Sequence, residues 1–257
     1  MKILKSMAVF GLLCAFMATS CSKDDDGDGT KVVVATPIKS MSVTDPAANI
    51  EKWEFTYDAN KRVSEIKNYW NGALDKTISY DYSVAGKLKI TSGTSVTNYE
   101  INSNNLVTKE LWDASGSEYS SYEYDANGFM TKVSEFWGGS SKLKQEAVIS
   151  NGSETKQTRF TDAGVASRIR EFTYTPGDNV NEIFQKPMID HNTKPIGGIF
   201  GKPNKKLLAA MKYWDPRESP IVERTTSFTY DFDAENRPIK VTSTLYDGTK
   251  EIVEFNY

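Results

Sequence analysis

Aromatic and polar residues alternate along several stretches of this chain. The runs are Trp53, Phe55 and Tyr57; Ile78, Tyr80 and Tyr82; Tyr122 and Tyr124; and Phe228, Tyr230 and Phe232. A period of two places every second side chain on the same face of a β-strand. A polar stretch such as Asp58-Ala-Asn60 follows most runs, and its residues tolerate positive φ and bond their own backbone. The pattern therefore predicts β-hairpins, each with an aromatic strand before its turn.

The same hairpin pattern recurs along most of the chain. In its best copies nine positions separate the last aromatic before the turn from an aliphatic residue on the return strand: 57 to 66, 124 to 133 and 232 to 241. Weaker copies span 80–90 and 99–106, and 172–183 keeps the spacing across a predicted turn at Pro176-Gly177-Asp178. Recurrence every 19 to 25 residues (57 to 82, 82 to 101, 101 to 124) indicates a repeated supersecondary unit.

Short connections between hairpins favour an all-β fold, an antiparallel up-and-down meander of about fourteen to sixteen strands. The chain ends on the alternating residues 253–257 without a further turn. We expect a closing strand there, paired with a strand near Lys31 or Ile50, which would remove the free edges of the sheet. The alternating runs are short and their apolar members are mostly Tyr, whereas a membrane-spanning strand needs about 9–11 residues. We therefore expect a soluble barrel or roll with its aromatic face inside and its charged face in water.

The N-terminus has the features of an export signal. Residues 1–20 combine Lys2 and Lys5 with an apolar run and then small residues. Ala18-Thr-Ser-Cys21 resembles a bacterial lipobox, which implies cleavage before Cys21 and acylation of that residue, in a palmitate-type lipoprotein; ordinary secretory cleavage is the alternative. Residues 21–30 form an acidic tether, and residues 31–257 a single β domain that begins with a candidate strand at 31–35.

The charge of the chain argues against some partners. The 257 residues carry a net charge of −3, and removal of residues 1–20 takes away two lysines and no acid, which gives −5. This balance argues against nucleic acid or an anionic bilayer surface as a partner. We expect contact with the membrane through the lipid anchor only.

An irregular insert at about 184–220 interrupts the repeats. It is rich in proline and glycine, and its apolar residues predict that it packs against the barrel or fills it. Phe184, Ile196, Ile199 and Phe200 are the side chains expected to be buried. Within the insert, residues 205–214 are compatible with a short helix or a strand.

These repeats resemble the tyrosine–aspartate repeats of bacterial secreted shell and toxin-cage proteins. With the lipobox and the insert, the mature chain resembles a Bacteroidota-type surface lipoprotein family of unknown function with a porin-like fold. The run from Cys21 to Asp26 also resembles the lysine-plus-acidic tag of such lipoproteins. The resemblance implies a porin-like barrel anchored by lipid on the outer face of the outer membrane, and no known activity.

Catalytic chemistry has little support in the sequence. His191 is the single histidine, and no nucleophile elbow, phosphate-binding loop or Cys/His cluster accompanies it. We therefore expect no metal and no cofactor. A glycosidase-type carboxylate pair could come from Glu54, Glu123, Glu171 or Asp231, although each alternates with aromatics as on the solvated face of a strand. A glycan-active hydrolase is the weaker hypothesis.

Large aromatics sit beside the turns at the far ends of the hairpins. These residues are Trp70, Trp112, Trp137 and Tyr246. They predict a rim that could stack sugar rings or hold another surface protein, and the alternative is that they cap the core. Sequence reasoning thus favours a non-catalytic, surface-anchored binding module, with a structural or accessory subunit of an outer-membrane assembly as the second hypothesis.

Overall fold

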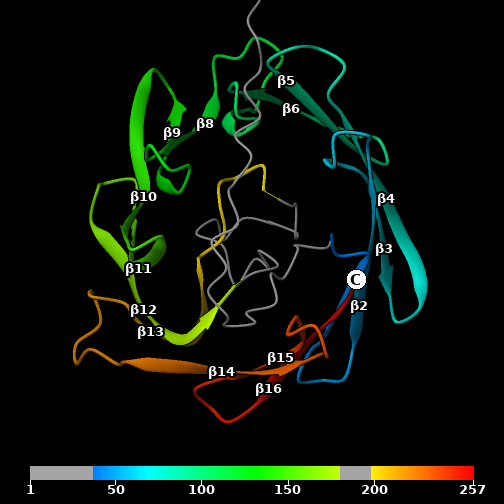
Figure 1. The fold of residues 1–257 in the computed structure, drawn as a ribbon. Coiled ribbons are helices and arrows are strands. Elements are labelled where there is room, and N and C mark those ends of the chain that lie inside the picture. Colours follow the sequence, from blue (N-terminus) through cyan, green and yellow to red (C-terminus); the bar gives the residue numbers. More distant parts are fainter. Residues whose placement is uncertain (1–36, 180–197) are drawn as a thin grey trace, which may run out of the picture. The chain divides into compact units, whose positions relative to one another are not determined.

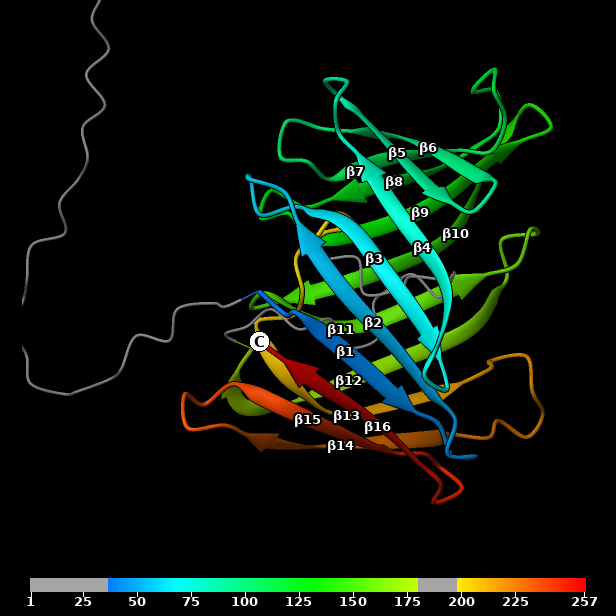
Figure 2. The same ribbon diagram turned by 90° about the vertical axis from the view of Figure 1, so that its right-hand side faces the viewer.

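A computed structural model describes residues 37–179 and 198–257, and these residues form a closed antiparallel β-barrel (Figures 1 and 2). Each strand pairs with its neighbours in the chain, which confirms the predicted up-and-down meander. The sixteen strands within the described residues are β1 (Ser40–Thr44), β2 (Ile50–Tyr57), β3 (Val63–Trp70), β4 (Ala73–Asp81), β5 (Lys87–Ser92), β6 (Ser95–Ile101), β7 (Val107–Leu111), β8 (Tyr119–Tyr124), β9 (Met130–Trp137), β10 (Ser140–Ser150), β11 (Ser153–Phe160), β12 (Ala166–Asp178), β13 (Lys206–Trp214), β14 (Arg224–Phe232), β15 (Pro238–Thr244) and β16 (Lys250–Asn256).

Some sequence predictions concern residues outside the described ranges. They are the signal peptide, Cys21, the acidic tether, the candidate strand at 31–35, Ile183, Phe184, His191 and Ile196. No helix within 37–179 and 198–257 is long and apolar enough to cross a bilayer.

The barrel closes where the predicted last strand meets β1. Met41 pairs with Phe255 and Val43 with Val253, and the other edge of β1 pairs with β2. The predicted closure is confirmed, but the partner of β16 is Ser40–Thr44, which the sequence analysis did not identify as a strand. This segment is short and largely Ser and Thr, so its two apolar residues are too few to show alternation.

The turns at one end of the barrel are built on an Asp or Asn side chain. Asp58 Oδ1 accepts hydrogen bonds from the backbone N–H groups of Asn60 and Arg62, both at 2.9 Å. Asp125, Asp233 and Asn102 accept the equivalent pairs. We call this end, with turns at 58–62, 102–106, 125–129 and 233–237, the Asp-turn end. The opposite end, with turns at 71–72, 112–118, 138–139 and 245–249, is the Trp end.

A β-bulge explains the nine-residue spacing of the repeat. Phe55 pairs with Ile66, whereas Tyr57 pairs with Val63 across a register shift. Equivalent shifts occur where Tyr124 pairs with Met130 and Phe232 with Pro238. The extra residue keeps the side chains on both sides of the bulge directed to the same face, so both Val63 and Ile66 are buried.

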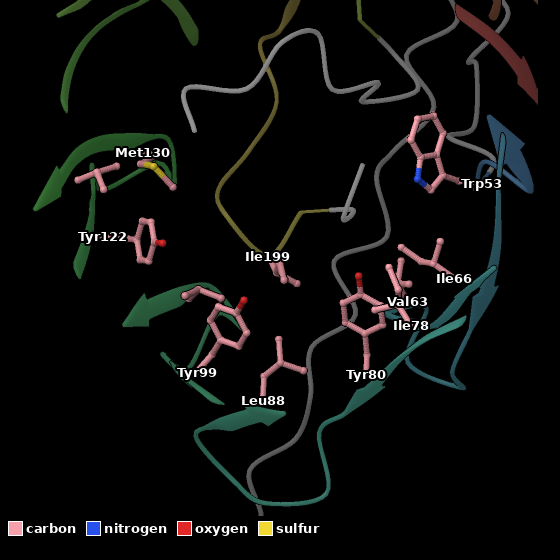
Figure 3. Close-up of a cluster of buried hydrophobic side chains, with 12 residues drawn as sticks. Trp53, Val63, Ile66, Ile78, Tyr80, Leu88, Tyr99, Tyr122, Met130 and Ile199 are labelled. Carbon is pink, nitrogen blue, oxygen red and sulfur yellow. The ribbon is translucent and has the colours of Figure 1, made fainter. Parts of the chain in front are cut away.

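The aromatic face of the sheet lines the interior, as predicted. Figure 3 shows Tyr99, Tyr122 and Met130 on one wall and Tyr80 and Trp53 on another, with Ile199 between them. A second buried cluster gathers around Phe172, Leu208, Met211, Phe228 and Val241. Outward positions on the same strands carry charge, including Lys52, Glu54, Lys89, Glu100, Lys109, Glu123, Lys132, Lys212 and Lys240.

Part of the predicted insert enters the barrel. Residues 198–205 run inside the ring of strands (Figure 1), where Ile199 is buried and the Phe200 ring contacts Tyr99 and Tyr122 at centroid distances of 6.1 and 5.2 Å. The carbonyl oxygen of Ile199 accepts a hydrogen bond of 2.8 Å from the Val107 N–H. The expected burial is thus confirmed for Ile199 and, in part, for Phe200. Of the two alternatives for residues 205–214, the structure has the strand, β13.

The predicted turn at Pro176-Gly177-Asp178 is wrong. Strand β12 continues through these residues, and Asp178 pairs with Lys206 at the start of β13. Two register shifts between β12 and β13 accommodate the Pro-Gly pair within the strand. A Pro-Gly sequence signals a reversal only when no partner strand holds the extended backbone, and β13 is 28 residues away along the chain.

Candidate functional site

The four predicted rim aromatics lie at the Trp end and are exposed. Trp70 and Trp137 end β3 and β9, Trp112 directly follows β7, and Tyr246 lies in the turn between β15 and β16. Their exposed fractions are 49%, 38%, 42% and 60%, respectively, whereas Trp53 on the neighbouring strand β2 is 6% exposed. These four side chains are therefore accessible to solvent and are not part of the buried core.

Strand pairing shows which way the rim side chains point. Trp70 is opposite Glu51, which shares the inward face of β2 with Trp53 and Phe55. Trp137 is on the same face of β9 as the buried Val133. Tyr69, next to Trp70, faces outward, where its hydroxyl donates a hydrogen bond of 3.0 Å to Glu54. The tryptophans thus belong to the interior face of the barrel, at its mouth.

The rim aromatics are distributed around the mouth. Two strand positions separate Trp112 from Trp137, and four separate Trp70 from Trp112. With neighbouring strands about 4.8 Å apart, these steps correspond to roughly 10 and 19 Å along the wall. The arrangement is a ring of separate aromatic contacts rather than one flat platform.

Charged side chains share the interior face just below the rim. On β10 to β14, Arg159 pairs with Arg168, and Arg170 and Arg224 both pair with Tyr213. Lys142 on β10 pairs with Glu135. We call Lys142, Arg159, Arg168, Arg170 and Arg224 the basic arc. The inward acids Glu51, Glu110, Glu135 and Glu251 lie on the remaining wall.

Two of the rim aromatics carry a cation from the basic arc over their rings. Lys142 Nζ lies 3.7 Å from the centroid of the Trp137 ring, and Arg224 Cζ lies 5.8 Å from that of Tyr246. The negative face of an aromatic ring attracts a cation at such distances. Trp70, in contrast, has the carboxylate of Glu51 as its cross-strand neighbour.

Buried polar side chains separate the charged rim from the apolar core. The Tyr122 hydroxyl donates a hydrogen bond of 2.8 Å to Glu110, and Asn68 Nδ2 donates one of 2.9 Å to Glu51. Burial and the neighbouring carboxylate of Glu110 raise the pKa of Tyr122, so this hydroxyl stays protonated and serves as a donor.

Deeper on β11, Glu154 is held in a buried network. Gln157 Nε2 donates a hydrogen bond of 3.2 Å to Glu154, and Arg170 donates one of 2.7 Å to Gln157. The Glu154 N–H donates to Asn204 Oδ1 at 2.7 Å, which links β11 to the 198–205 segment. Burial raises the pKa of Glu154 to about 8, against the weaker opposing effects of Gln157 and Arg170.

The carboxylates considered for a hydrolase do not meet. Glu54, Glu123, Glu171 and Asp231 lie on β2, β8, β12 and β14, each on the outward face. The ammonium of Lys52 and the hydroxyl of Tyr69 lower the pKa of Glu54, so it is a surface carboxylate held as an anion. Within the described ranges, no group of three or more His, Cys, Asp or Glu is placed to hold a metal ion.

The basic arc was missed by the sequence analysis, although the signal for it was present. Arg168 and Arg170 stand four and two positions before the aromatic Phe172, so a period of two places all three on one face. Glu51 precedes Trp53 in the same way. The sequence analysis predicts that charged residues in the aromatic runs face solvent. Those an even number of positions from an aromatic share its face, however, and point into the barrel.

Comparisons with known proteins show the fold. No protein-family description matches the chain, and neither does any curated protein sequence. The chain is similar to the crystal structure of a porin-like protein from Bacteroides uniformis, with a TM-score of 0.66 and 17% identity over 86% of this chain and 98% of the other. It is also similar to a porin-like protein from Bacteroides vulgatus, with a TM-score of 0.55 and 9% identity over 86% of this chain and 98% of the other.

Proposed function

We propose that this protein is a non-catalytic, surface-anchored binding module that holds a glycan at the Trp end of its barrel. The observation that carries the proposal is the set of exposed aromatics at one mouth, Trp70, Trp112, Trp137 and Tyr246, above an interior wall of charged side chains. Sugar rings stack on such aromatics, and their hydroxyl groups bond to carboxylates and guanidinium groups. The spacing around the mouth suits a chain of several sugars better than a single ring.

Transport through the barrel has less support than binding. Two apolar clusters, with Ile199 and Phe200, occupy much of the interior toward the Asp-turn end, and pockets of about 820 and 740 Å³ lie between its turns and residues 202–205. The outward face carries lysines and glutamates in place of the apolar band that a lipid-embedded barrel needs. A barrel held at the outer membrane through acylated Cys21, with its body in water, fits these features and the lipobox-like sequence.

A structural role in an outer-membrane assembly is the second candidate. On the outward face of β8 and β9, the Tyr119 and Phe136 rings stack with a centroid distance of 5.2 Å and an angle of 14°. Leu111 is the cross-strand neighbour of Tyr119, so these three form a small apolar strip on the outside. Such a strip is a feature of contacts between proteins rather than of sugar binding.

The glycan proposal is tested with full-length protein in which Cys21→Ala removes the acylation site. We expect the Trp70→Ala/Trp137→Ala double variant to lose at least tenfold in affinity for a saccharide selected on a glycan array. Phe232→Ala, an exposed aromatic at the Asp-turn end, is the matched control and is expected to bind normally. Unchanged binding by a folded double variant would contradict the proposal.

The anchor is tested by fractionation. We expect the Cys21→Ala protein to be released from the membrane fraction, while the unmodified protein stays there. Recovery of the variant in membranes after a salt wash would mean that something other than lipid holds the protein.

A further inference from the structure

Inward-facing cations are concentrated on one part of the interior wall. The five cations of the basic arc face inward on β10 to β14, where Lys144 also forms an ion pair of 2.9 Å with the inward Glu135. The acids Glu251, Glu51, Glu110 and Glu135 face inward on strands outside that arc, and Lys76 on β4, opposite the buried Asn68, is a further inward cation there. The whole chain carries a net charge of −3, so this concentration of positive charge runs against the overall balance. The wall formed by β10 to β14 is therefore the more positive side of the mouth.

The arc places like charges together at a cost to stability. Arg159 and Arg168 are directly opposite each other in the register of β11 and β12, and like charges in this position destabilise a sheet. Local arrangements that disfavour folding are concentrated at functional sites. Arg159, Arg168 and Arg170 also make contacts within the protein.

Lys142 and Arg224 lie at the rim itself. Lys142 stands over Trp137, and none of the described carboxylates forms an ion pair with its ammonium group. Arg224 stands by Tyr246 and has an ion pair of 3.6 Å with Glu218 through Nη1. A guanidinium has five donors in a planar fork that matches a carboxylate or sulfate. Each of these two rim positions therefore combines an aromatic face with a cation.

We infer that the basic arc and its two rim pairs, Trp137 with Lys142 and Tyr246 with Arg224, select an anionic saccharide that bears carboxylate or sulfate groups. This inference rests on the proposed glycan binding and names the class of glycan. The aromatic faces of Trp137 and Tyr246 hold the sugar rings, and the cations bind the acidic substituents. Trp70, next to Glu51, contacts uncharged sugar units of the same saccharide.

The experiment compares polymers that differ in charge alone. Polygalacturonate is paired with its fully methyl-esterified form, and dextran sulfate with dextran. We expect the Cys21→Ala protein to bind at least one acidic polymer at least tenfold more tightly than its neutral partner, with affinity that falls as salt is raised. The carboxylate and sulfate pairs identify which substituent is recognised.

Variants locate the preference on the arc. Lys142→Gln/Arg224→Gln is expected to lose about tenfold or more in affinity for the acidic polymer and much less for the neutral polymer, so that the ratio of the two affinities falls. Lys132→Gln/Lys240→Gln removes two outward cations from β9 and β15 and is the control, expected to stay within twofold.

The outcomes separate the two proposals. Equal affinity for acidic and neutral polymers, or an acidic preference that survives Lys142→Gln/Arg224→Gln, overturns the inference and leaves glycan binding in place. Loss of all saccharide binding in Trp70→Ala/Trp137→Ala supports the Trp end as the glycan-binding site. If the parent protein binds no saccharide, both the proposed function and this inference are overturned. Equally tight, arc-dependent binding of single-stranded DNA overturns the assignment to saccharide.

Discussion

The two halves of the barrel interior differ although the same strands build both. Toward the Asp-turn end, Ile66, Leu88 and Leu208 are almost fully buried, and Ile199 fills the space between the walls. Toward the Trp end, the inward face carries charges and exposed aromatics. Strand β2 shows both within eight residues, since Glu51 precedes Trp53, Phe55 and Tyr57 on one face.

This difference shows how a wide barrel can combine a packed region with an accessible mouth. Sixteen strands enclose more space than their own side chains fill, so complete apolar packing needs an additional segment. Residues 198–205 supply that segment at one end only, among the residues that the structure describes. The interior toward the Asp-turn end is thus packed, and the exposed aromatics at the Trp end stay accessible to solvent.

The largest effect is expected from a tryptophan in the packed half. Trp53→Ala should lower the free energy of unfolding by about 3–5 kcal/mol, because it removes a buried large aromatic. Denaturation in urea measures the change. Trp53→Phe is the control and should lose much less, since it keeps an aromatic ring and removes an indole N–H that lacks a partner among the described atoms.

Glu154 gives the packed half a dependence on pH. Its pKa is raised from 4.5 to about 8 in the folded protein, so folding favours the protonated form. The contribution of Glu154 to the free energy of unfolding is therefore fully present below pH 4.5. It is lost as the pH rises toward 8. Each pKa unit corresponds to about 1.4 kcal/mol, so the loss by pH 8 is on the order of a few kcal/mol.

Glu154→Gln should remove this dependence. We expect the variant and the parent to have similar unfolding free energies at pH 5, and the variant to be the more stable at pH 8. Glu123→Gln, on the outward face, is the control. Parallel pH profiles for parent and Glu154→Gln would show that the carboxyl is ionised without penalty.

Gly201 tests how tightly the 198–205 segment is seated. A Cβ at this position would lie 3.2 Å from the Gly128 oxygen and the Met130 nitrogen, and φ is +108°. Gly201→Ala should cost about 1–3 kcal/mol through backbone strain and this contact. Gly198 has φ +71° and no atom within 4 Å, so Gly198→Ala should cost about 1 kcal/mol. Equal losses in thermal denaturation would mean that the close approach has no energetic consequence.

The smallest effect is expected at the mouth. Trp70→Ala should change the unfolding free energy by about 1 kcal/mol or less, because half of this side chain is already in water. Substitution by alanine should therefore cost much less unfolding free energy at Trp70 than at Trp53, although the two residues lie on neighbouring strands and on the same face. A loss comparable to that of Trp53→Ala would place Trp70 in the core in solution.

Much of the fold could be predicted because its signals are local. Runs such as Trp53, Phe55 and Tyr57 show their inward face through a period of two, and an Asp or Asn in many of the turns accepts bonds from the next few residues. The site was predictable in part: the rim aromatics were found by their place beside the far turns. The basic arc was not found: the phase of Arg168 and Arg170 with Phe172 indicates which face they take, but which cations lie beside them depends on the neighbouring strands.

The sequence by itself determined the strands, the hairpins and the end of the barrel to which Trp70, Trp112, Trp137 and Tyr246 belong, because strand period and turn chemistry act over a few residues. Only the tertiary structure decided that β16 closes on Ser40–Thr44, that β12 continues through Pro176, and that Ile199 lies between the walls. It also decided that Lys142 and Arg224 stand beside rim aromatics. Apart from the contact of Lys142 with Trp137 across one short hairpin, these features depend on contacts between residues far apart in the chain, such as the bond from Lys39 to Tyr257 across 218 positions. A local pattern carries no information about such neighbours.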